Sequence, residues 1–127
     1  MSCQVIHTER APAAIGPYSQ AVKAGDWLFV SGQIGLHPET GELVSNDLTG
    51  QAGQALENLS QIVTAAGCRL TDVVAVDVYL TEMGQFAAFN ELYQQVFSNH
   101  RPARAVVEVS ALPKGALIEI KCIAHLH

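Results

Sequence analysis

The chain has 127 residues, which is enough for one domain and leaves little room for a second. Only 15% of the residues are charged and 49% are hydrophobic, so part of the surface is expected to contact protein rather than water. The net charge is −5 and the seven basic residues are scattered, which argues against binding nucleic acid or an anionic membrane through bulk charge.

The chain ends and the apolar runs predict a cytoplasmic protein. The first residues lack the basic and apolar regions of a signal peptide. No apolar run approaches the roughly 20 residues of a membrane span. Cys3, Cys68 and Cys122 show no paired spacing, so we interpret them as lone thiols of an intracellular protein.

Turn residues divide the first third of the chain into short strands. We predict strands over residues 4–7, 18–23 and 27–31. The last two are joined at Ala24, Gly25 and Asp26, which is a hairpin signal. Segments 11–17 and 37–47 are predicted loops, because proline and glycine punctuate both.

Two amphipathic helices are predicted in the rest of the chain. The first has apolar residues at the three-and-four spacing of one helical face, namely Ala52, Ala55, Leu56, Leu59, Ile62, Val63 and Ala66. Thr49 or Asp47 would cap its start, and Gly67 would follow its end. The second runs from about residue 84 to 98, with the apolar face Phe86, Phe89, Leu92, Tyr93, Val96 and Phe97.

Three further strands are predicted over residues 73–80, 105–110 and 117–125, which gives the order βββαβαββ and an α+β fold with both helices on one face of the sheet. Alternation in the strand 73–80 places Val74, Val76, Val78 and Leu80 on one side, and Val73, Ala75 and Tyr79 on the other with only Asp77 polar. A strand that is apolar on both sides is buried on both sides. We therefore predict that another subunit covers the second face.

Arg104 stands directly before the strand predicted at residues 105–110, and Pro102 stiffens the segment ahead of it. A guanidinium there offers a planar pair of donors to a carboxylate. Arginine also forms salt bridges at strand edges and interfaces, and local chemistry alone favours that structural role.

Three other polar residues interrupt apolar segments. Glu119 shares a strand face with Lys121, either as part of a solvated face or as a half-buried general base that activates water. Tyr18 follows Gly16-Pro17, where it either hydrogen-bonds a ligand or packs at a subunit boundary, and local chemistry favours packing. Asn90 lies within the apolar face of the second helix, so its amide needs a partner.

No metal site or phosphate loop is predicted. The five histidines form no ligand pair with a carboxylate at helical spacing, and residues 31–35 follow a strand without opening a helix. We interpret His125 and His127 as a frayed or solvated tail.

Taken together, these residues resemble the RidA family of imine deaminases, also called the YjgF type, over nearly the whole chain. The similar blocks are APAAIGPYSQA at 11–21, SGQI at 31–34 with PETG at 38–41, QALENL at 54–59, and RPARAVVE at 101–108 with LP at 112–113 and IEI at 118–120. Each block is weak alone, but four blocks in order make the resemblance specific.

The resemblance implies a single RidA-like domain over residues 1–127 with a chorismate-mutase-like fold, a six-stranded mixed sheet, and a homotrimer whose ligand sites lie between subunits. It implies hydrolysis of 2-imino acids or their enamine tautomers, such as 2-aminoacrylate from pyridoxal-phosphate-dependent dehydratases, to 2-oxo acids and ammonia, without cofactor or metal. Arg104 would bind the substrate carboxylate and Glu119 would position or activate water. Tyr18, Gly32 and Asn90 would line the pocket.

One position departs from the family pattern. Many similar members carry cysteine two positions after the arginine, whereas this chain has Val106, which argues against a thiol-dependent role at the site. Two other functions stay open: a non-catalytic trimer that binds small carboxylates or regulates a partner, and the ribonuclease activity described for some relatives. The net charge of −5 argues against the ribonuclease.

Overall fold

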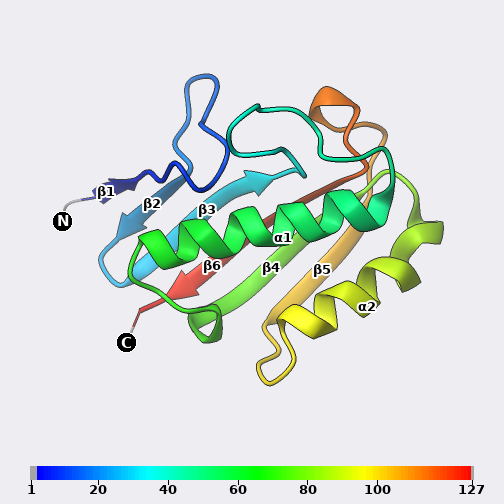
Figure 1. Cartoon of the computed structure of the whole chain (residues 1–127). Helices are drawn as coiled ribbons and strands as arrows, with labels where there is room; N and C mark the ends of the chain where they lie inside the picture. The colour runs from blue at the N-terminus through cyan, green and yellow to red at the C-terminus, as the bar shows by residue number, and fades with distance from the viewer. Residues whose placement is uncertain (1–2, 127) are drawn as a thin grey trace.

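The computed structural model describes residues 3–126 as one six-stranded mixed sheet with two helices (Figure 1). The strands are β1 (Cys3–Ile6), β2 (Ala21–Ala24), β3 (Trp27–Gln33), β4 (Val73–Leu80), β5 (Ala103–Glu108) and β6 (Ile118–His125). The helices are α1 (Leu48–Ala65) and α2 (Phe86–Val96), with short 3₁₀ turns η1 (Leu70–Asp72), η2 (Met83–Gln85) and η3 (Pro113–Gly115). This confirms the predicted order βββαβαββ.

The strand order in the sheet is β1-β2-β3-β6-β4-β5, so the last strand of the chain lies in the middle. β4 and β5 are parallel and are connected through α2, whereas the other neighbouring strands are antiparallel. β2 and β3 form the predicted hairpin, in which Ala24 pairs with Trp27 and Gly25 adopts a positive φ of 61°.

Helix α1 has the predicted apolar face and a capped start. Asp47 is the N-cap, because its side-chain oxygen Oδ1 accepts a hydrogen bond of 2.8 Å from the backbone N–H of Gly50. Thr49 is therefore a residue of the helix and not its cap. Gly67 follows the other end with φ of 82°, the left-handed conformation that favours glycine after a helix.

Helix α2 is shorter than predicted, because η2 precedes it and the predicted start at residue 84 falls within that turn. Its predicted face is confirmed. Phe89, Tyr93 and Phe97 are buried, and Phe86 is half-buried against the same cluster.

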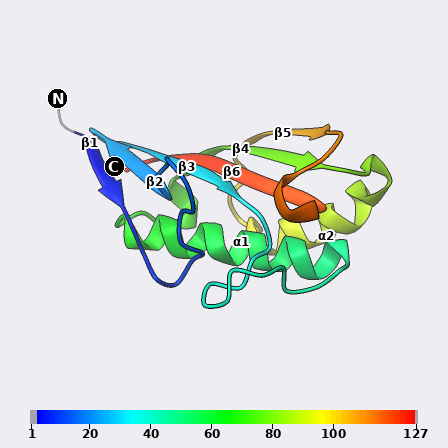
Figure 2. The ribbon, with the colours of Figure 1, turned by 90° about the horizontal axis from the view of Figure 1, so that it is seen from above.

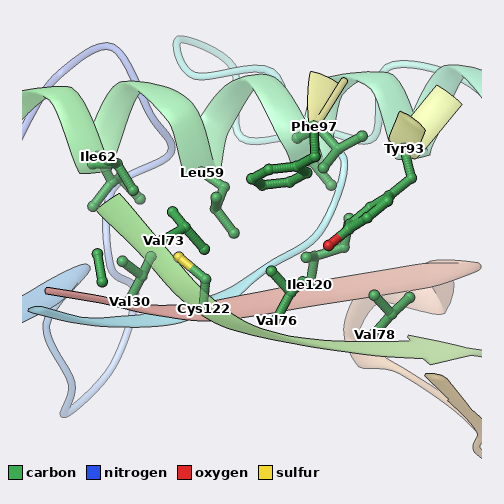
Figure 3. Close-up of a cluster of buried hydrophobic side chains, with 14 of the residues drawn as sticks. Val30, Leu59, Ile62, Val73, Val76, Val78, Tyr93, Phe97, Ile120 and Cys122 are labelled. Carbon is green, nitrogen blue, oxygen red and sulfur yellow. The ribbon is translucent and has the colours of Figure 1, made fainter. Parts of the chain in front are cut away.

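The hydrophobic core lies between the helices and one face of the sheet. Figure 3 shows side chains from α1 and α2 meeting side chains that project from the strands, and its labels mark Val30, Leu59, Ile62, Val73, Val76, Val78, Tyr93, Phe97, Ile120 and Cys122. At roughly 1.5–3 kcal/mol for each fully buried large side chain, this layer supplies the main driving force for folding.

The predicted alternation of β4 is wrong at one end. Val73 pairs with Ala124 and Ala75 with Ile123, so Val74 is an extra residue in a β-bulge. The bulge moves Val73 to the buried face with Val76, while Val74 is 40% exposed. Strand β4 therefore has one face buried in the core and one partly exposed face, rather than two equally buried faces.

Three other predicted boundaries need correction. Arg104 lies inside β5, which spans Ala103–Glu108, rather than before a strand at 105–110. Tyr18 lies in a loop, because β2 begins only at Ala21. His125 belongs to β6 and its ring contacts the Trp27 ring edge-on at 4.5 Å, so it is not part of a frayed tail. His127 lies outside the described residues.

Both helices lie on one side of the sheet, and within residues 3–126 no helix packs on the other side (Figure 2). That open face has an apolar row in register across all six strands, formed by Val5, Val22, Phe29, Ile123, Ala75 and Ala103. Phe29 is 48% exposed. The prediction of a second, uncovered apolar face is confirmed, and what covers it remains a prediction.

Candidate functional site

A cavity of about 490 Å³ lies where β3 ends and β6 begins. Its walls come from four segments that are far apart in the sequence, namely residues 12–20, the end of β3 with residues 34–36, the η3 turn, and the start of β6. Tyr18, Gly32 and Glu119 all line it. The structure thus brings together three of the five residues that the sequence predicted for the site.

Glu119 is half-buried in β6, in register with Tyr79, on the open face of the sheet. Its carboxylate lies against Gly32, because a β-carbon built on Gly32 would come within 2.4 Å of Glu119 Oε2. Burial raises the pKa of the Glu119 carboxyl above its ordinary value, and the nearby Lys121 acts in the opposite direction. The group therefore has the raised basicity of a carboxylate in a partly apolar site.

Tyr18 stands at the rim of the cavity and is 53% exposed. Its backbone N–H donates a 2.9 Å hydrogen bond to the carbonyl of Gly16, which has φ of 126° and so requires glycine. The tight turn explains why Tyr18 leaves the strand predicted for it.

Two buried amides of helix α1, one at a cavity wall and one behind the start of β6, were not among the residues predicted from the sequence. Asn58 Nδ2 donates to the carbonyls of Ile34 (3.3 Å) and Leu36 (3.0 Å). Gln51 Oε1 accepts from the backbone N–H of Leu117 at 2.8 Å. Both residues are polar positions seven apart on an apolar helical face, and that pattern was the available signal.

Arg104 projects from β5 toward helix α2, because it is in register with the buried Val76. Its Nη1 donates a 2.8 Å hydrogen bond to Asn90 Oδ1. Its guanidinium lies over the Tyr93 ring at 4.6 Å and the Phe86 ring at 5.5 Å. The Asn90 amide, which the sequence predicted to need a hydrogen-bond partner, therefore binds Arg104. The Tyr93 and Phe86 rings help to orient the guanidinium.

Arg104 and Glu119 lie on opposite faces of the sheet within one chain. Glu119 pairs with Tyr79 on β4, and Tyr79 pairs with Val107 on β5, which places Arg104 two strands away and three residues along the strand. At about 4.8 Å between strands and 3.3 Å per residue, these offsets are each on the order of 10 Å. One chain therefore does not join Arg104 and Asn90 to the cavity of Tyr18, Gly32 and Glu119.

None of the three thiols lines the cavity of Glu119 or the two hollows beside Arg104. Cys122 alternates with Glu119 on β6 and points into the core, where burial raises its pKa to about 12. Val106 lines the hollow beside Arg104. Cys3, Cys68 and Cys122 are free cysteines.

The part of the chain that the structure describes contains no group of three or more histidine, cysteine or acidic residues placed to hold a metal ion. Among the same residues, no helix has the length and apolarity needed to cross a bilayer.

The fold and the cavity define a small α+β protein that places a half-buried carboxylate at the end of a mixed sheet. The chain belongs to the RidA (YjgF-type) family, since residues 8–126 match the family model described as Endoribonuclease L-PSP. Its sheet and helices are consistent with the chorismate-mutase-like α+β fold of that family. These findings confirm the predicted family and fold.

Three known proteins illustrate the similarity. A RutC family protein of Pyrococcus horikoshii is 54% identical over 96% of this chain and 97% of its own. The human 2-iminobutanoate/2-iminopropanoate deaminase is 49% identical over 95% of this chain and 88% of its own. The structure of E. coli TdcF with bound serine has a TM-score of 0.93 and 43% identity, and the match covers 98% of this chain and 99% of that one.

Proposed function

We propose that this protein is a 2-iminobutanoate/2-iminopropanoate deaminase, which hydrolyses 2-imino acids and their enamine tautomers to 2-oxo acids and ammonia. One observation carries the proposal: the carboxylate of Glu119 lies against Gly32 in a largely apolar cavity, where burial raises its pKa. The 49% identity to the human enzyme of that name supports the same activity.

The chemistry needs little more than a placed water and a base. Glu119 accepts a proton from water as the water oxygen attacks the electrophilic imine carbon. From the protonated imine this gives a carbinolamine, and protonated Glu119 passes its proton to the amino nitrogen. The C–N bond then breaks, ammonia leaves, and the ionised Glu119 accepts the hydroxyl proton as the carbonyl forms; that proton finally passes to ammonia or solvent. Because an iminium carbon is already electrophilic, orientation supplies much of the required acceleration.

Arg104 would bind the substrate carboxylate, and Asn90 with the two aromatic rings would hold the guanidinium in place. Because Arg104 and Glu119 lie on opposite faces of one chain, we propose that each site combines Arg104 of one subunit with Tyr18, Gly32 and Glu119 of the next. The uncovered apolar row supports an assembly in which that face is buried, and the number of three subunits comes from the family resemblance.

The direct test feeds purified protein with 2-aminoacrylate generated by a dehydratase in excess, and follows release of pyruvate and ammonia. We expect acceleration over buffer, and loss of it in Arg104→Ala and Glu119→Gln proteins of unchanged oligomeric state. A wild-type protein that gives no acceleration would contradict the proposal.

A mixing experiment tests whether the site is shared. Arg104→Ala and Glu119→Gln chains, each inactive alone, are coexpressed with different tags and the mixed oligomers are isolated. In a mixed trimer of either composition, one of the three interfaces would pair an intact Arg104 with an intact Glu119, so about a third of the wild-type activity should return. Mixed oligomers without activity would show that both residues act within one chain.

Two other functions give different outcomes in the same assay. A non-catalytic regulatory trimer would bind 2-oxobutyrate in an Arg104-dependent manner without turnover. The serine bound in the structure of the similar protein TdcF is compatible with this alternative. If the protein has the ribonuclease activity named in the family model's description, it would cleave RNA, and the Arg104→Ala protein would still do so. The net charge of −5 disfavours RNA binding. A cytoplasmic location stays a prediction from the sequence.

A further inference from the structure

Gln20 is a buried amide, 2% exposed, whose side chain makes four hydrogen bonds to one loop. Its Oε1 accepts from the N–H of Thr8 at 2.8 Å, and its Nε2 donates to the carbonyls of Thr8 (3.0 Å), Ala11 (3.4 Å) and Pro12 (2.8 Å). All of these partners are backbone groups. The side chain thus takes the place of a β-ladder for a segment that has no strand partner of its own.

The loop fixed in this way forms a wall of the cavity. Residues 12–15 line the cavity directly, Tyr18 follows three residues later at the rim, and Gln20 is itself among the lining residues. Buried backbone groups need partners, and a loop without them is mobile. The position of this wall therefore depends on the four hydrogen bonds of the Gln20 amide.

The backbone around Gln20 is joined to the part of β3 that faces Glu119. The carbonyl of Gln20 accepts a 2.9 Å hydrogen bond from the N–H of Ser31, and Ser31 Oγ donates to the carbonyl of Ser19 at 2.6 Å. Ser31 immediately precedes Gly32, against which the Glu119 carboxylate lies. Gln20 thus connects the loop that carries Tyr18 with the strand end that accommodates the carboxylate.

We propose that Gln20 is a positioning residue of the site, whose amide holds residues 8–18 in the conformation that closes the cavity and places Tyr18. This inference rests on the proposed function for its kinetic consequence, but not for its structural one. The substitution Gln20→Glu distinguishes the amide's donors from its shape, because it replaces the amide by a carboxyl group of similar size. When ionised, that carboxyl group would face three carbonyl oxygens without a donor, whereas its protonated form keeps one donor.

The experiment compares Gln20→Glu with Gln20→Met, which keeps similar size and loses all four hydrogen bonds. At pH 8 we expect both variants to lose at least about tenfold in kcat/KM toward 2-aminoacrylate. As pH falls, the ratio of Gln20→Glu to wild type should rise, while that of Gln20→Met stays constant. Gln61→Glu on helix α1, where the amide donates to Glu57 at the surface, adds the same charge and should behave as wild type.

A second measurement does not depend on activity. Limited trypsin digestion at pH 8 reports on the bond after the exposed Arg10, inside the loop, relative to the bond after the exposed Arg69 at the η1 turn. We expect the Arg10 bond of Gln20→Glu to be cut at least about tenfold faster relative to Arg69, with the oligomer intact.

The outcomes separate the two proposals. Unchanged cleavage at Arg10 in the Gln20→Glu and Gln20→Met proteins would overturn the inference, and so would faster cleavage with unchanged kcat/KM. If Gln20→Glu and Gln20→Met had the same pH profile of kcat/KM relative to wild type, Gln20 would act only by filling space and not through its hydrogen bonds. If the wild-type protein shows no turnover, the proposed function fails, and the trypsin comparison alone then decides whether Gln20 holds the loop.

Discussion

The carboxylate of Glu119 and the α-carbon of Gly32 lie so close that a β-carbon on Gly32 would come 2.4 Å from Oε2 and 2.7 Å from Cδ of Glu119. Real β-carbons do not approach other atoms this closely, so glycine is what allows β3 and the carboxylate to meet. The backbone of β3 therefore forms one wall of the candidate site, and the neighbouring strand β6 supplies the carboxylate.

Gly32→Ala should therefore displace the Glu119 carboxylate and lower kcat/KM for imine hydrolysis by about tenfold or more, because small displacements of a catalytic group are costly. Steady-state kinetics with 2-aminoacrylate checks this. The matched control is Gly53→Ala on helix α1, where an added β-carbon meets no atom within 4 Å. The control should keep activity and gain about 0.5–1 kcal/mol of stability. Equal activity in the two variants would contradict the role given to Gly32.

Activity should fall as pH decreases, with a midpoint above the ordinary glutamate value of about 4.3, because burial raises the pKa of Glu119 and only its ionised form accepts a proton. A pH–rate profile of kcat/KM measures that midpoint. Glu119→Gln should lose about 10²- to 10⁴-fold, the usual contribution of a general base. A profile that is flat from about pH 5 to 8 with substantial activity in Glu119→Gln would rule out the base.

The same raised pKa has a consequence for stability with the opposite sign. The folded chain binds the Glu119 proton more tightly than the unfolded chain does, so this group lowers the free energy of unfolding as pH rises through its folded pKa. Glu119→Gln should consequently have a higher Tm than wild type at pH 7, and this difference should shrink below the unfolded pKa near about 4.3. Calorimetry at pH 7 and pH 3.5 checks this, and a lower Tm at pH 7 would contradict it.

Asn90→Asp should weaken binding of 2-oxobutyrate. Asn90 Oδ1 already accepts from Arg104 Nη1 at 2.8 Å, so an aspartate there would compete with the ligand carboxylate for the guanidinium. We expect Kd to rise by about tenfold or more, which corresponds to about 1.4 kcal/mol. Isothermal titration calorimetry measures this, and Gln95→Asp, exposed on the same helix, controls for the added charge. A similar Kd in the Asn90→Asp and Gln95→Asp proteins would contradict the proposal that Arg104 binds the ligand carboxylate.

Phe29→Lys should convert the proposed homotrimer, in which the open face of the sheet is buried, into monomers and abolish turnover. Phe29 lies in the middle of the apolar row on the open face, where a buried ammonium without a partner would cost several kcal/mol. Sedimentation velocity measures the assembly state. Ala87→Lys, exposed on helix α2, should leave the assembly intact. A monomeric and fully active Phe29→Lys protein would refute both the covered face and the shared site.

The elements that sequence predicts best are those in which local periodicity and core packing agree. The apolar face of α1 and its Asp47 cap follow from residue spacing and from one short polar side chain. The face of Val73 does not, because a single extra residue at Val74 changes the side on which it points. Alternation within one strand contains no information about a bulge that forms only when β4 pairs with β6.

The functional role of Gln20 was equally hidden in the sequence. It stands in a segment that reads as a strand, and its four hydrogen-bond partners lie 8 to 12 residues earlier. Asn58 and Gln51 left a weak signal, since each is an amide on an apolar helical face. Which backbone groups they would bind depended on loops whose course no local rule fixes.

The amino-acid sequence by itself determined the family, the order of the elements and the helical faces, and it predicted the candidate site residues. The tertiary structure alone decided that Arg104 faces helix α2 while Glu119 faces the open side of the sheet. The physical reason is that strand register and bulges, which set the direction of each side chain, arise from pairing between distant segments. Because of this register, the candidate residues form two separate groups within one chain. This separation is the basis of the proposal that two subunits share each site.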